Sequence, residues 1–178
     1  MKTRCGFLNR VIVLILSALI PFRLMGDPGG EYEVKSALVF NFLKFAEFAE
    51  HAGSGQITLC LISPTAEAAA PFTHLNGQFI GSRALDIRLV QVWQLPDRCD
   101  VAFFPGDNSG NALEGLARLR GNGTLTIGEM PGFAAAGGII GLFEEGQRVR
   151  FEINPDNAAV ERIRLSSRLL SLARIARN

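Results

Sequence analysis

Segment 31–48 contains neither glycine nor proline, and its apolar residues recur every three to four positions. This spacing places the apolar residues on one side of a helix, so the pattern predicts a long first helix over 31–48. The predicted stripe comprises Val34, Leu38, Phe42, Phe45 and Phe48. We expect it to pack against the core of the protein.

Four shorter apolar runs have the length and composition of β-strands. They cover residues 57–62, 84–90, 101–104 and 124–127. The first run is almost wholly apolar, which is typical of a strand covered on both faces of a sheet. Charged and apolar residues alternate in 84–90, which predicts a half-exposed edge strand with Leu85, Ile87 and Leu89 facing inward.

Predicted helices separate these strands, a weak one from Thr65 and a stronger one over 111–119. Strands that alternate with helices pair in parallel through right-handed crossovers. A hairpin with arms 139–143 and 148–153 follows, and then a short helix to about residue 162 and a last helix over 166–176. The pattern predicts an α/β fold: a single three-layer domain with a mixed, mostly parallel sheet and a C-terminal β-hairpin.

The N-terminus has the pattern of a secretory signal peptide. Basic residues precede a short apolar run, 11–20, that ends at Pro21. The run is short for a membrane span, which takes about 20 apolar residues. We predict a signal peptide over 1–26, a mature domain over 27–178 and a periplasmic location; a retained membrane anchor is the alternative.

Export would change the charge balance and the cysteine count. Residues 1–26 hold four of the 18 basic and none of the 17 acidic residues, so the mature chain has a net charge near −3. This charge argues against nucleic acid as a partner. Cys60 and Cys99 remain, an even number in an oxidising compartment, and both flank or lie in apolar strands. We favour a structural disulfide between them; two buried free thiols are the alternative.

Catalytic patterns are absent from the sequence. The two histidines lie far apart, and no metal-ligand spacing, nucleophile elbow or phosphate-binding loop occurs. No pair among the acidic residues is singled out as catalytic. The sequence therefore favours a binding protein without metal or cofactor over an enzyme.

A loop rich in small residues, 128–138 (GEMPGFAAAGG), follows a predicted buried strand, where open α/β sheets place ligand crevices. Its glycines, among them Gly137 and Gly138, permit close approach of a partner's backbone, and Phe133 is a candidate exposed anchor. Arg148 and Arg150 alternate with apolar residues on the hairpin arm and complete the candidate partner surface. The alternative is a loop that only packs tightly.

These segments together resemble the YfiR family. The matching pieces are EYEVKSALVFNFLKF, ITLCLI, the strand after Cys99, LTIGEMPGFAAAGGIIGLFEEGQRVRFEINPDNA and IRLSSRLLSLARI, over about 31–177. The family cysteines in the first strand and before the third fall on Cys60 and Cys99. A second family pair falls on Ala134 and Gly141, so redox control there does not carry over.

The resemblance implies a periplasmic regulator. It would repress an inner-membrane diguanylate cyclase by binding its periplasmic sensor domain, and so control cyclic di-GMP and biofilm formation. An outer-membrane lipoprotein would relieve repression by sequestering the regulator, and a homodimer is expected. Another receptor or sensor kinase as target, a small-ligand sensor that uses the crevice near the glycine-rich loop, and an unrecognised hydrolase are the alternatives.

Overall fold

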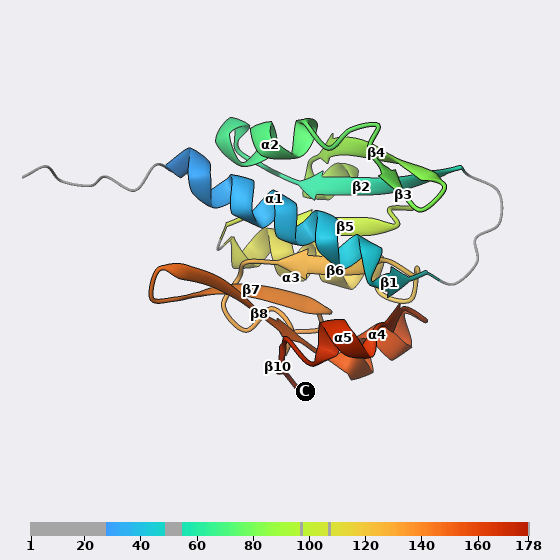
Figure 1. Cartoon of the computed structure of the whole chain (residues 1–178), viewed down its shortest axis with the longest axis vertical. Helices are drawn as coiled ribbons and strands as arrows, with labels where there is room; N and C mark the ends of the chain where they lie inside the picture. The colour runs from blue at the N-terminus through green and yellow to red at the C-terminus, as the bar shows by residue number, and fades with distance from the viewer. Residues whose placement is uncertain (1–27, 49–54, 97, 107, 178) are drawn as a thin grey trace, which may run out of the picture.

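The computed structural model describes residues 28–48, 55–96, 98–106 and 108–177 (Figure 1). The predicted signal peptide over 1–26 lies outside these residues. The helices are α1 (Pro28–Lys44), α2 (Ala66–Thr73), η2 (Val92–Gln94, a 3-10 turn), α3 (Ser109–Leu119), α4 (Pro155–Val160) and α5 (Ser167–Leu170). The strands are β1 (Ala46–Glu47), β2 (Gln56–Ile62), β3 (Phe79–Ile80), β4 (Arg83–Val90), β5 (Val101–Phe104), β6 (Leu125–Gly128), β7 (Ile140–Glu145), β8 (Arg148–Ile153), β9 (Arg164–Leu165) and β10 (Arg174–Ile175).

Eight strands form one mixed sheet in the order β10-β8-β7-β6-β5-β2-β4-β3, and β1 pairs with β9 outside it. The five central strands, from β4 to β7, are parallel. β3 runs antiparallel to β4 and β8 runs antiparallel to β7, whereas β10 pairs in parallel with β8. The chain starts the parallel sheet at β2 and winds outward in both directions, which makes a topological switch point between β2 and β5. The predicted α/β fold with a mixed, mostly parallel sheet and a late hairpin is confirmed.

Helices cover both faces of this sheet. Figure 1 shows α1 in front of the sheet and α3 behind it. The core on the α1 face includes Phe42 and Phe72, and the core on the α3 face includes Phe104 and Phe133. A short apolar strand such as β2 therefore buries side chains on both faces, as its composition predicted.

The first helix begins earlier and ends earlier than predicted, but most of the predicted stripe faces inward. Phe42 is buried, and Leu38, Phe45 and Phe48 are partly buried and pack against the core. Lys35, Val39 and Phe42 are buried, whereas Val34, which was placed on the stripe, is half exposed. The helix ends at Lys44 because the next residues pair with a distant segment: Ala46 aligns with Leu165 in the β1–β9 ladder. No glycine or proline marks this end, so the local sequence did not reveal it.

The predicted C-terminal helix over 166–176 is wrong. Ser166 caps only the four-residue α5, and the chain then extends into β10, which pairs with β8. Leu172, which would lie within that helix, is 69% exposed. Pairing beside β8 is a long-range contact, and it outweighs the local helical spacing.

The edge-strand prediction for 84–90 holds in part. β4 lies next to the end of the sheet, and β3 pairs only with Arg83 and Ala84, so most of its outer edge is open. Leu85 faces inward as predicted, but Leu89 is 56% exposed.

Candidate functional site

The glycine-rich loop 128–138 packs against the α3 face of the sheet, and its aromatic residue is not exposed. Phe133 is fully buried and its ring centre lies 5.6 Å from that of Phe104. A Cβ atom at Gly128 or Gly138 would lie 2.4 Å or 2.2 Å from the Phe133 ring, so these glycines make room for it. The expectation of an exposed anchor at Phe133 is therefore wrong: the ring takes the place that a helix side chain fills elsewhere on this face.

Side-chain amides hold the backbone of this loop in place. Asn154 and Asn157 each donate a hydrogen bond from Nδ2 to the carbonyl of Ala134, and Asn157 also donates to the carbonyl of Gly138 at 2.8 Å. Both asparagines are buried. One side of the loop is thus fixed to the core, whereas Pro131, Gly132 and residues 135–137 are exposed.

The predicted arginines of the hairpin do lie on the surface. Val149 and Phe151 of β8 face α1, since the Phe151 ring lies 4.9 Å from that of Phe42. Alternation along the strand turns Arg148 and Arg150 to the other face, where both are exposed. That outer face also carries other charged and aromatic groups. Glu145 forms an ion pair with Arg150, with 3.3 Å between Oε2 and Nε. The guanidinium of Arg174 lies over the ring of Phe143, with its Cζ 4.0 Å from the ring centre.

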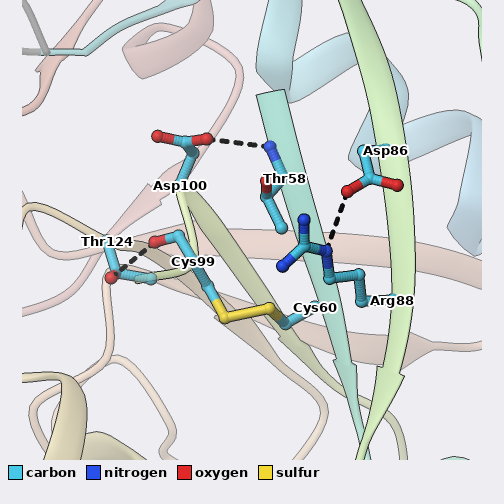
Figure 2. The surroundings of a disulfide bond; sticks show 7 residues. All are labelled: Thr58, Cys60, Asp86, Arg88, Cys99, Asp100 and Thr124. Carbon is cyan, nitrogen blue, oxygen red and sulfur yellow. Dashed lines mark hydrogen bonds and ion pairs between the residues drawn. A yellow bond between two sulfur atoms is a disulfide. The ribbon is translucent and has the colours of Figure 1, made fainter. Parts of the chain in front are cut away.

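Cys60 and Cys99 form a disulfide, shown in Figure 2, with a Cα–Cα distance of 5.9 Å. It connects the middle of β2 to the residue that precedes Asp100 and β5, and both cysteines are buried. Polar contacts fix the surroundings: Asp100 accepts from the backbone N–H of Thr58 at 2.8 Å. The bond crosslinks the switch-point strands inside the core, which is a structural position.

A buried ion pair that the sequence did not single out lies at the carboxyl edge of the sheet. Glu129 directly follows β6, and its Oε2 lies 3.1 Å from Nζ of Lys35 on α1. The same Oε2 accepts from the backbone N–H of Gly106, which follows β5, at 2.7 Å. Side chains of both partners are more than nine-tenths buried. The signal in the sequence was weak: one lysine within an otherwise apolar side of the first helix, and one acid at a strand end.

Electrostatics keep the ammonium group of Lys35 charged. Burial alone would lower the pKa of Lys35, but the hydrogen bond to Glu31 and the charge of Glu129 outweigh it and raise that pKa. Burial, together with the negative charge of Glu129, raises the pKa of the neighbouring Tyr32 hydroxyl. Lys35 is therefore protonated and Tyr32 neutral at physiological pH.

The described residues carry neither a metal-binding cluster nor a membrane-spanning helix. They contain no cluster of three or more histidine, cysteine, aspartate or glutamate side chains that would hold a metal ion. None of the helices in this part of the chain has the length and hydropathy of a membrane span.

The fold and the disulfide define an α/β protein whose two switch-point strands are covalently linked. The chain belongs to the YfiR/HmsC-like family, whose model matches residues 32–174. It also resembles a solved structure of a conserved domain protein from Vibrio cholerae O1 biovar El Tor strain N16961, with 12% identity and a TM-score of 0.56. The alignment covers 82% of this chain and 60% of that one, so the likeness concerns the fold. A search of curated proteins finds no match.

Proposed function

We propose that this protein is a periplasmic regulator that binds the sensor domain of an inner-membrane signalling protein, with a diguanylate cyclase as the favoured partner. Membership of the YfiR/HmsC-like family supports a regulatory role. The buried disulfide is consistent with an oxidising compartment. Regulation of this kind requires no catalytic residue, only a difference in affinity for two states of the partner.

The single observation that supports a partner-binding surface is the exposure of two arginines on the outer face of the hairpin. Arg148 and Arg150 project from β8 into solvent, and the exposed ion pair of Arg150 with Glu145 contributes little to stability. The outer edge of β8 is paired only at its end, where β10 adds two residues. Arginines beside an open sheet edge suit an acidic partner surface. Gly137 lies on the exposed part of the neighbouring loop and stays a candidate contact.

The test is capture of envelope proteins by the exported chain, combined with measurement of intracellular cyclic di-GMP. We expect the wild-type protein to retain a membrane cyclase and the deletion strain to contain more cyclic di-GMP. Charge reversal by Arg148→Glu with Arg150→Glu should abolish capture. Arg118→Glu is a matched control, because Arg118 on α3 is equally exposed and also pairs with a glutamate, Glu114.

Each outcome separates the parts of the proposal. Capture of another receptor without a change in cyclic di-GMP would support the regulatory role but contradict a cyclase as the partner. If the charge-reversed protein captures its partner at the wild-type level, the outer face of the hairpin is not the binding surface. Absence of any membrane partner would refute the regulatory function itself. Sequestration by an outer-membrane lipoprotein and a homodimer are further predictions, which crosslinking in intact cells and light scattering of the purified protein would check.

A further inference from the structure

A hollow of about 400 Å³ opens beside the buried ion pair. Its lining includes the charged residues Lys35 and Glu129 and the apolar residues Leu142, Phe143 and Val149. Figure 1 shows the start of α1 and the turn of the hairpin at the same end of the molecule, and the hollow lies between them. Its size falls in the range of small-molecule sites, and carboxyl edges of parallel strands are the usual place for such sites.

One atom in this hollow lacks a partner. Oε2 of Glu129 is used twice, by Lys35 and by the backbone of Gly106, but the buried Oε1 has no hydrogen bond from any described residue. Leaving a buried carboxylate oxygen unpaired is costly. A second buried glutamate shows the usual solution: Glu161 accepts from the backbone N–H of Gly121 through one oxygen and of Gly123 through the other.

The charges around the hollow determine which kind of group can donate a hydrogen bond to Oε1 of Glu129. Lys35 is already shared between Glu31 and Glu129, and Glu144 adds another carboxylate to the lining. The carboxylates of Glu31, Glu129 and Glu144 thus outnumber the single ammonium group of Lys35, which disfavours an anion and favours a positively charged donor. The apolar residues of the lining, Leu142, Phe143 and Val149, suit a hydrocarbon or aromatic body.

We propose that this hollow binds a small organic amine with an apolar body, whose ammonium group donates to Oε1 of Glu129. The apolar part lies against Leu142 and Val149, beneath the hairpin. This site stands apart from the partner surface, because Val149 faces α1 whereas its neighbours Arg148 and Arg150 face away.

The test measures binding to the purified, exported protein alone, by calorimetric titration with 2-phenylethylamine. Phenylacetate and 2-phenylethanol serve as the anionic and neutral analogues of the same size. We expect saturable binding of the amine and at least tenfold weaker binding of both analogues. Glu129→Gln keeps the shape of the side chain and should weaken amine binding by about 10- to 100-fold, as expected for losing a charge-assisted hydrogen bond. Glu114→Gln, an equal change of charge on the exposed face of α3, should leave binding unchanged.

A second variant covers the case in which Glu129→Gln does not fold. Val149→Phe places a larger side chain in the hollow from a half-buried strand position, so it should abolish amine binding. The fold should be retained, which circular dichroism would check. Equal binding of the three probes, undiminished binding by Glu129→Gln, or no binding of the amine with only an ordered water on Oε1 in a crystal structure would overturn the proposal. None of these outcomes bears on the membrane partner, so the two proposals fail independently.

Discussion

The steric fit of Phe133 between two glycines makes Gly138→Ala a sharp test of the loop. A Cβ at Gly138 would lie 2.2 Å from Cε1 of the ring, whereas carbon atoms in contact are about 3.5–4.0 Å apart. The ring cannot retreat, because Gly128 touches its other edge and Phe104 packs against it. Overpacking of a core typically costs about 1–3 kcal/mol, and with both edges closed we expect the upper part of that range. The φ angle of Gly138 is not left-handed, so the cost measures the clash.

The assay is urea unfolding of the oxidised protein, and the decisive comparison is a double-mutant cycle. Phe133→Leu removes the ring atoms that meet the new Cβ, so Gly138→Ala should cost at least about 1 kcal/mol less in that background. Gly30→Ala is the control: Gly30 lies in α1 with no atom near the new Cβ, and the change should be neutral or stabilising. A neutral Gly138→Ala, or an equal cost in both backgrounds, would refute the steric role of the glycines.

Three further predictions concern stability and are checked by the same unfolding assay. Replacing Cys60 and Cys99 together by alanine opens a crosslink of sequence separation 39 and should cost about 3–4 kcal/mol; a cost below about 1 kcal/mol would contradict a structural role. Glu161→Ala leaves two backbone N–H groups after the end of α3 without their acceptor and should lower the free energy of unfolding by about 2–4 kcal/mol. A change near zero would show that water replaces the carboxylate. The folded pKa of Lys35 is raised, so the stability due to its charge is complete below its unfolded pKa, about 10.4, and is lost as pH rises through the higher folded value. The stability difference between wild type and Lys35→Met should therefore be constant from about pH 6 to 9 and change only above about pH 10; a change near neutrality would contradict this assignment.

Much of the sheet could be predicted from sequence because its strands are short apolar runs bounded by turn residues. β2, β5 and β6 are buried on both faces, so burial leaves a direct mark in their composition. The hairpin was predictable for a similar reason: a glycine turn joins arms with opposite alternation. Local composition and tertiary environment agree in these elements.

The errors occur where long-range pairing decides the structure. Residues after Lys44 leave the helix to pair with Leu165, and residues after α5 pair with β8, and neither event has a local signal. The inward side of α1 was predicted only in part, because Lys35 is buried and Val34 is exposed. A lysine is expected in solvent unless a carboxylate pairs with it. That carboxylate, Glu129, is far away in sequence, so the ion pair and the hollow beside it could not be read from spacing.

The glycine-rich loop was misread for a related physical reason. Glycine permits two opposite outcomes, a backbone open to a partner and a backbone closed over a large side chain, and the sequence does not distinguish them. Here Phe133 fills the space, and Asn157 ties the loop to the start of α4. For this reason we place the proposed partner surface on the outer face of β8 and not on the loop.

The hollow and the proposed partner surface lie on opposite faces of the same strand, β8. Val149, which lines the hollow, lies between Arg148 and Arg150, which face solvent on the other side of the same strand. A molecule seated under the hairpin would contact β8 from the α1 face, while a partner would contact it from the outer face. β8 pairs with β7 along its length but with β10 only at Glu152 and Ile153, so its outer edge is open toward the turn of the hairpin. Any displacement of β8 by the one occupant alters the surface offered to the other, and a coupling free energy of about 1–3 kcal/mol would suffice to change partner affinity by about 5- to 150-fold.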